Sequence, residues 1–246
     1  EIDILEPSLH VVRDENGVWT FEGAFGELIA GWSAERDLFP AIRVRGGSVH
    51  YRDSWRRDDL PVRQDLLDID ASIDHAPDGV FRFKGTTRTA FLDRLKISGE
   101  LVPARDSVEI AFSAKRFNVS SQVMRLVGPQ AEELRRHFNL HGFVDLKGEF
   151  RFDKKSGLVP TGVSGELLNC YLQPPAFPLA LEGVSGEFEL DGTTLRLKGI
   201  EGSLGAGTFR CDGVVEATPA WTEIAAVKLQ AAATAVPIDS HLHGWV

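Results

Sequence analysis

The sequence contains few sulfur-bearing residues and no long apolar run. Among its 246 residues are two cysteines, Cys170 and Cys211, and one methionine, Met124. Two cysteines do not define a disulfide framework, so we favour two small residues packed in strands over a disulfide bond. No apolar stretch is long enough to cross a membrane as a helix, and no secretory signal is recognisable. Because the sequence begins at Glu1, we expect an excerpt of a longer chain or a processed product.

An excess of positive charge is also missing. The chain has 27 Lys and Arg against 36 Asp and Glu, which gives a formal net charge of −9. A general positive field is what draws a protein to nucleic acid or to anionic lipid headgroups. The composition therefore argues against nucleic acid as a partner, and Arg56-Arg57 and Arg135-Arg136 are only local basic spots.

What the sequence has is period-two alternation. In the segment Leu179–Glu216, apolar residues alternate with charged ones, and Asp191-Gly192 supplies a tight turn. Alternation around a DG turn is a strong local signal for a β-hairpin. The segment predicts a three-stranded antiparallel meander with one apolar and one charged face. Residues 67–74 show the same alternation.

A glycine motif recurs within these strands. The pattern apolar-x-Gly-Glu-apolar occurs four times, centred on Gly99, Gly148, Gly165 and Gly186. Each glycine shares a face with the two apolar residues around it. We therefore expect that face to lack a side chain at the glycine, which lets the sheet bend sharply.

The predicted fold class is all-β: a long curled antiparallel sheet of about fourteen strands, with one short helical pair near 120–138. We expect a hairpin of Leu9–Val12 with Val18–Phe21, and a turn or bulge at Gly46-Gly47-Ser48. Around Ser120 the apolar spacing becomes helical, and Pro129 suits the first turn of the second helix. The chain is thus divided into an N-terminal sheet segment (1–118), a helical connection (119–140) and a C-terminal segment (141–246) that continues the same sheet.

Three stretches resemble a known family. EPSLHVVRDENGVWTFE near the start resembles the opening of AsmA-like proteins, and IRVRGGSVHYRD is similar to the glycine-centred strand pair that follows it there. LEGVSGEFELDGTTLRLKGIEGSLGAGTFRCDGVVEA is similar to the repeated C-terminal strands of AsmA, TamB and YhdP-type proteins. The resemblance covers most of the chain, but its motifs are mainly glycine placement and alternation.

The resemblance implies a repeating β-groove, or β-taco, whose apolar trough carries phospholipid or other acyl lipids between the bacterial inner and outer membranes. It implies a periplasmic location, with an inner-membrane anchor in a part of the protein that this sequence lacks. Ten apolar strand residues would line the trough: Phe81, Phe83, Ile97, Ile110, Phe112, Phe150, Phe152, Phe188, Leu197 and Phe209. Each of them also suits ordinary packing, because apolar strand faces commonly meet a second sheet in a sandwich.

No catalytic or metal-binding constellation is evident, so we expect neither an enzyme nor a cofactor. His137 with His141, and His241 with His243, lack further ligands at suitable spacing. The aspartates at 68, 70 and 74 fit a solvated outer face better than a calcium site. Two alternatives to lipid transfer remain: a periplasmic scaffold that assists the assembly of outer-membrane proteins through its sheet edges, and a carbohydrate-active β-sandwich.

Overall fold

The all-β prediction is confirmed by a computed structural model. It describes residues 1–14, 40–54, 62–76, 78–102, 107–120, 123–124, 129–153, 157–173, 180–218 and 222–235, with side chains except at 53, 62, 129, 130, 152, 153 and 157–161. These residues form thirteen strands and the helix α3 (Pro129–Phe138). The strands are β1 (Ile2–Leu5), β2 (Ser8–Arg13), β3 (Ile42–Asp53), β4 (Val62–His75), β5 (Phe81–Thr89), β6 (Leu92–Val102), β7 (Ser107–Asn118), β8 (His141–Asp153), β9 (Gly157–Leu172), β10 (Leu181–Asp191), β11 (Thr194–Leu204), β12 (Gly207–Ala217) and β13 (Ile224–Thr234).

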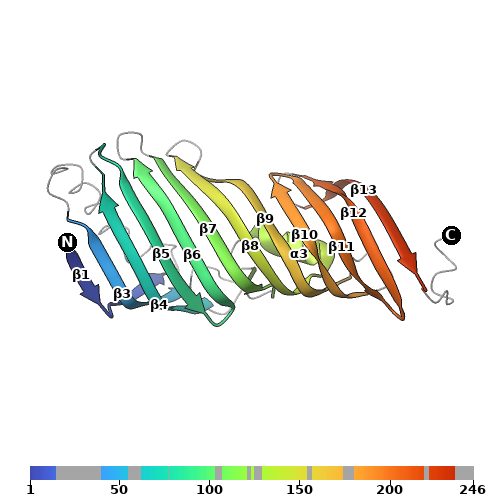
Figure 1. Cartoon of the computed structure of the whole chain (residues 1–246), viewed down its shortest axis with the longest axis horizontal. Coiled ribbons are helices and arrows are strands. Elements are labelled where there is room, and N and C mark those ends of the chain that lie inside the picture. Colours follow the sequence, from blue (N-terminus) through green and yellow to red (C-terminus); the bar gives the residue numbers. More distant parts are fainter. Residues whose placement is uncertain are drawn as a thin grey trace. The chain divides into compact units, whose positions relative to one another are not determined.

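The strands follow one another in a single sheet that does not close. Its hydrogen-bonded order is β1-β3-β4-β5-β6-β7-β8-β9-β10-β11-β12-β13, with β2 also paired to β3 (Figure 1). The predicted meander is confirmed as β10, β11 and β12, which pair antiparallel. By contacts the described chain divides into two compact units: unit 1 is 1–113 with 149–159, and unit 2 is 114–148 with 160–246.

The prediction of antiparallel pairing is wrong at one edge of unit 1. Both β1 and β2 pair with β3 in parallel, one after the other along its length. Between them the chain breaks at Glu6, whose φ is 49°, and the Ser48 N–H donates to the Pro7 carbonyl. Parallel neighbours need a long connection, and residues 14–41 supply it. The predicted partner of β2, Val18–Phe21, lies outside the described residues.

Bulges in both units bend the strands, and aspartates hold them. Gly46 (φ 64°) interrupts the register of β3, so the predicted turn or bulge is a bulge within one continuous strand. The Gly46 N–H donates to Asp70 on the next strand, at 3.1 Å. In unit 2 the N–H of Arg116 (φ 51°) donates to Asp145 at 2.9 Å, and that of Gly199 (φ 59°) to Asp212 at 2.7 Å. At the Gly46 and Gly199 bulges the carboxylate thereby satisfies an N–H beside the break in register, and such bulges add local bend and twist.

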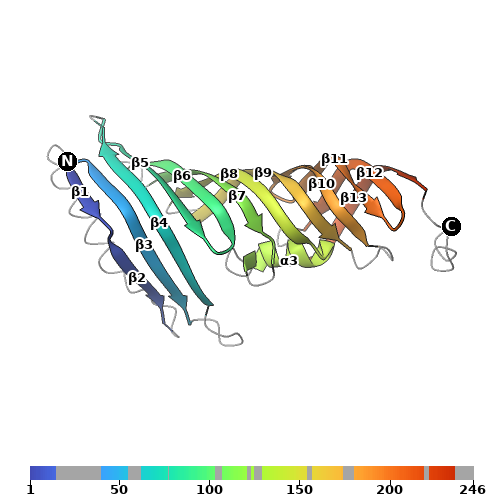
Figure 2. The ribbon, with the colours of Figure 1, turned by 60° about the horizontal axis from the view of Figure 1, so that its bottom comes forward.

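Helix α3 corresponds to the second predicted helix. Of the first, only Val123 and Met124 are described, and both are helical. Leu134 and Phe138 of α3 pack against a buried cluster of Leu195, Val215 and Ala217 on β11 and β12. The carbonyl of Phe138 accepts the N–H of Gln173 at 3.0 Å, which ties the end of the helix to the segment after β9. Within unit 2, α3 therefore covers part of the apolar face of the sheet (Figure 2).

Candidate functional site

The apolar face of unit 1 is built from side chains in register across neighbouring strands. Phe83 on β5 lies opposite Ile73 on β4 and Gly99 on β6. Two residues further along β5, Gly85 lies between Ala71 and Ile97. Side chains directly opposite each other share a face of the sheet. The predicted alternation thus places these residues on one side, as the sequence indicated.

The predicted lining residues differ in burial. Phe81 is 2% exposed and contacts the ring of His75, with centroids 4.7 Å apart, so it is packed within the protein. Phe112 and Phe150 stack at 5.2 Å. The side chain of Phe152 lies outside the described residues. The remaining predicted side chains are half-buried: Phe83, Ile97, Ile110, Phe112, Phe150, Phe188, Leu197 and Phe209.

In unit 2 the chain itself covers two of the predicted lining residues. Phe188 and Leu197 lie directly opposite each other on β10 and β11. Both pack against the Leu195–Val215–Ala217 cluster that Leu134 and Phe138 of α3 also contact. In unit 1 every described helix or strand belongs to the sheet. In unit 2 helix α3 therefore covers part of the apolar face of the sheet. In unit 1 no described element lies over that face.

We expected the motif glycines to leave gaps on the apolar face, but at Gly99 and Gly165 the gap is filled. A Cβ placed at Gly99 would lie 2.6 Å from Cζ of Phe83, and one at Gly165 would lie 2.9 Å from Cζ of Phe188. Phe83 and Phe188 are the cross-strand neighbours of these glycines. Each phenyl ring thus lies across the glycine on the adjacent strand, and the ring fills the space that the missing side chain provides.

A groove of about 880 Å³ crosses β3 to β7 in unit 1, and three consecutive residues of each strand line it. Only Ile97 and Phe112 of the predicted lining residues take part. Ile73 and Phe83, which flank the Ala71–Gly85 pair on the apolar face, are not among the lining residues. Each strand contributes one residue of the apolar face, Val44, Ala71, Gly85, Ile97 or Phe112, together with the residue on either side of it.

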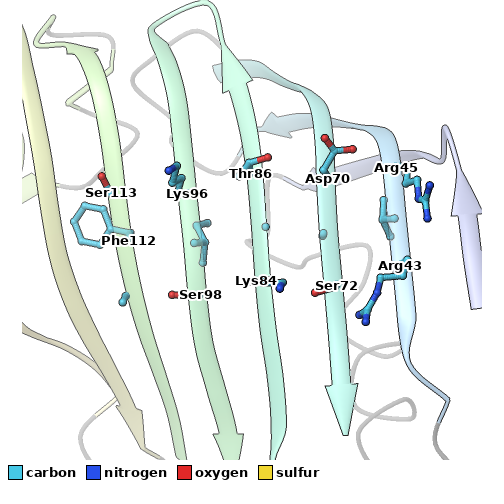
Figure 3. Close-up of a pocket in the computed structure, with 15 residues that line it drawn as sticks. Arg43, Arg45, Asp70, Ser72, Lys84, Thr86, Lys96, Ser98, Phe112 and Ser113 are labelled. Carbon is cyan, nitrogen blue, oxygen red and sulfur yellow. The ribbon is translucent and has the colours of Figure 1, made fainter. Parts of the chain in front are cut away.

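Polar residues of two rows are also among the lining residues (Figure 3). Arg43, Ser72, Lys84 and Ser98 form one row in register, and Asp70, Thr86 and Lys96 form the other together with Arg45. Arg43 donates to Asp74 at 2.8 Å, and Arg45 lies 3.5 Å from Asp3. In the described part of the chain, neither Lys84 nor Lys96 has an ion-pair partner. The two arginines are thus neutralised by carboxylates outside the lining, Asp74 and Asp3.

Ser72 is the buried polar residue of this groove. It is 6% exposed, although its strand neighbours Arg43 and Lys84 lie on the charged face. Its Oγ is shielded from solvent and has no hydrogen-bond partner among the residues that the structure describes. A buried hydroxyl without a partner costs free energy, so such a group calls for an explanation. The sequence reading missed it because alternation identifies Ser72 only as one more residue of the polar face.

The sequence reading also missed a row of polar residues across β2, β3 and β4. The rings of His10 and His50 stack at 4.8 Å, and His50 Nδ1 lies 2.8 Å from Asp65. Ser48 Oγ is 3.5 Å from His50 Nε2. Ser48, His50 and Asp65 are thus linked in the same order as the residues of a catalytic serine–histidine–aspartate triad. However, the nearby N–H groups of Ser48 and Gly46 already donate to Pro7 and Asp70, so neither can stabilise an oxyanion.

The predicted outer-face aspartates carry structural roles. Asp68 forms an ion pair with Arg88, Asp70 accepts the Gly46 N–H, and Asp74 pairs with Arg43. Within the described residues, no three His, Cys, Asp or Glu side chains form a group that could hold a metal ion. His141 Nε2 lies 3.1 Å from Asn139 Oδ1. His241 and His243 lie outside the described residues.

Comparison with protein-family models, curated proteins and solved structures finds no match to this chain. Among the residues that the structure describes, no helix is long and apolar enough to span a membrane. The geometry alone therefore defines the class: an all-β protein whose sheet has an apolar face and a charged face, with a candidate binding groove across β3 to β7.

Proposed function

We propose that this chain is a segment of an intermembrane lipid-transfer protein of the bacterial envelope, similar to AsmA-like proteins, and that it binds acyl chains on its apolar face. The observation that supports this most directly is the apolar face of unit 1. Its large side chains are half-buried, and every described element of that unit belongs to the sheet itself. Phospholipid is the proposed cargo, the periplasm the proposed location, and the membrane anchor belongs to another part of the protein.

The hydrophobic effect supplies the required driving force. Exposing an acyl chain to water costs about 0.8 kcal/mol per CH₂, hence on the order of 10 kcal/mol for a typical chain. Apolar contact is non-directional, so it needs no specific ligand chemistry. A sheet face with stacked rings such as Phe112 and Phe150 offsets much of this cost while the headgroup stays in water.

Lipid bound to the purified chain tests this proposal. We expect organic extraction followed by mass spectrometry to find phospholipid in molar proportion to the protein. Phe112→Asp places a charge on the apolar face and should reduce this loading several-fold. Ser107→Asp adds the same charge to the other face of the same strand and serves as the matched control. Equal loading of both variants, with native circular dichroism, rules out the apolar face as the lipid site.

A second candidate function is a scaffold for outer-membrane protein assembly, and the edge strand β13 favours it. Ile224, Val227 and Leu229 are 36%, 53% and 51% exposed, and β13 ends the order of paired strands. An edge strand presents unpaired backbone groups that can add a strand from another chain. A photoreactive residue at Leu229 should then crosslink β-barrel precursors, whereas one at Phe112 should crosslink lipid. Lipid adducts from both positions contradict the scaffold.

A further inference from the structure

Helix α3 covers the apolar face of unit 2 where two of the predicted lining residues lie. Leu134 and Phe138 of the helix pack against the buried cluster on β11 and β12, and Phe188 and Leu197 contact the same cluster. An acyl chain on this part of the sheet would need the apolar side chains that the helix already covers. The helix and such a ligand therefore compete for one surface.

The chain on both sides of α3 is attached to one rim of the unit 2 sheet, the rim at which β8 begins and β9 ends. Before the helix, the Val119 N–H donates to the Gly142 carbonyl at 2.8 Å, near the start of β8. At its end, the Phe138 carbonyl accepts the N–H of Gln173, just past β9, at 3.0 Å. Backbone hydrogen bonds thus fix where the chain leaves and rejoins the sheet.

The cluster that α3 contacts lies at the opposite rim. Leu195 is the second residue of β11 and Ala217 is the last of β12. Because neighbouring strands are antiparallel, these positions lie where β10 ends, whereas β9 ends beside the start of β10. The 11 residues of β11 would span about 35 Å if straight, but the 10 residues of α3 span only about 15 Å. The helix reaches both rims because the sheet curls, so α3 lies across the opening between them.

Two large apolar side chains, Leu134 and Phe138, hold the helix against this cluster. The nearly buried ion pair of the helix joins Arg135 to Glu132 through hydrogen bonds of 2.9 and 3.0 Å. Both partners belong to α3, so the pair can move with the helix and need not break when the helix leaves the sheet. Apolar contacts are non-directional, and an acyl chain can replace them.

We propose that α3 is a lid over the apolar face of unit 2, and that an acyl chain displaces it from the Leu195–Val215–Ala217 cluster. This inference rests on the proposed function, because the displacing ligand is the acyl cargo. The closed lid lowers the apparent affinity of unit 2 for the chain, since only the open fraction can bind. The ligand in turn shifts the helix toward the open state, because it binds that state better.

Titration of the lipid-free 246-residue chain with cis-parinaric acid, a fatty acid that fluoresces in apolar surroundings, tests the lid. Leu134→Gln removes one of its two apolar contacts and should raise the apparent affinity several-fold. Arg136→Gln is the matched control on the exposed side of the helix, where the Arg136 side chain is 64% exposed, and should leave the affinity unchanged. Unchanged or weaker binding by Leu134→Gln overturns the lid.

A second substitution assigns the gain in affinity to unit 2. Adding Leu197→Asp to Leu134→Gln places a charge on the surface that the helix covers, so it should abolish the gain. Adding Phe112→Asp instead changes unit 1 and should leave the gain intact. Circular dichroism verifies that each variant is folded. A gain that persists with Leu197→Asp contradicts competition between the helix and the acyl chain.

Hydrogen exchange of the unmodified chain gives a readout that needs no substitution. The amides of α3 should exchange faster when the fatty acid is bound, because the displaced helix loses its contacts with the sheet. A helix that only completes the hydrophobic core would exchange at the same rate or more slowly with ligand. Either of those results overturns the lid.

Failure of the lid and failure of the proposed function give different results. If the parent chain binds the fatty acid, Phe112→Asp weakens binding and Leu134→Gln changes nothing, the sheet binds acyl chains but α3 is not a lid. If Leu134→Gln binds and the parent chain does not, the lid is supported in its strongest form. If neither binds the fatty acid, both proposals are overturned.

Discussion

The phenyl ring of Phe188 lies across Gly165 on the neighbouring strand, with its Cζ 2.9 Å from the place that a Cβ would occupy. In unit 1, Phe83 lies across Gly99 in the same way. In both places a Cβ on the glycine would also collide with a backbone carbonyl on the strand at its other side. That carbonyl belongs to Asp145 for Gly165 and to Glu109 for Gly99. At these two motif glycines the glycine on one strand is thus paired with a phenylalanine on the next, whereas a Cβ at Gly186 would meet Ile200.

This pairing predicts that the glycines are intolerant of even a methyl group. Gly165→Ala should lower the free energy of unfolding by about 2–3 kcal/mol, because the neighbouring carbonyl is backbone and cannot rotate away. Urea denaturation followed by circular dichroism measures the change. Ser164→Ala, at the adjacent position on the other face, is the control and should change stability little. A tolerated Gly165→Ala would mean that the ring and the strands readjust freely.

Helix α3 stabilises unit 2 through two side chains. Phe138→Ala should cost about 3–4 kcal/mol, because it removes a ring packed against the Leu195–Val215–Ala217 cluster. Arg136→Ala on the exposed side of the same helix loses only a surface ion pair with Glu133 and should cost less than about 1 kcal/mol. Thermal unfolding of the two variants provides the comparison. Equal midpoints would show that the helix contributes little to the stability of the apolar face.

Strand content was predictable from the sequence because alternation is a local property. The segment 67–74 lies within β4, and Pro129–Phe138 is helical as its spacing indicated. The parallel pairing of β1 and β2 was not predictable, since it depends on where the connection of residues 14–41 returns the chain. The aspartates at the bulges were likewise hidden, because Asp70 and Gly46 lie 24 residues apart in sequence.

The candidate sites were predictable only in part. Alternation separated the two faces over most of β4 and β5, but it misplaced Leu67. That residue was expected to share a face with Ile69, yet it lies opposite Arg88 beyond a register shift and is 42% exposed. Phe81 illustrates the limit, because it alternates like Phe83 but is only 2% exposed. Burial of Ser72 could not be inferred either, because alternation places it on the same face as the exposed Lys84 opposite it.

Asp145 should make stability depend on pH in the acid range. Burial alone would raise the pKa of its carboxyl, but hydrogen bonds from Lys115 and from the Arg116 N–H, with their charges, lower the pKa below its ordinary value. A lowered folded-state pKa contributes stability above the unfolded value, near 4, and that stability is lost as pH falls through the folded value.

Asp145→Asn removes this titration and keeps the size of the side chain. We expect its denaturant midpoint to lie below that of the parent chain at pH 7, and the difference to shrink as pH falls below about 4. The measurement is a series of urea titrations between pH 7 and pH 2.5. Asp93→Asn, an exposed carboxylate on β6, is the control. A constant difference at all pH values contradicts the role of the Asp145 charge.

Cys170 and Cys211 should be unreactive in the native chain. Both are free thiols and are 1% and 4% exposed. Burial raises the pKa of each thiol, and the charge of Asp212 raises that of Cys211 further. The Cys170 Sγ also donates to the Phe143 carbonyl at 3.1 Å. Since the thiolate is the reactive species, both burial and the raised pKa slow the reaction with a thiol reagent.

A colorimetric thiol assay at pH 8 should therefore detect almost no reaction in buffer and two thiols per chain in denaturant. Detection of two thiols also verifies that the cysteines do not pair with each other, which the strand positions of Cys170 on β9 and Cys211 on β12 already indicate. Rapid labelling of one cysteine in buffer would reveal local opening of its strand, because the closed structure offers the reagent no access. Comparison of Cys170→Ser with Cys211→Ser would identify which strand opens.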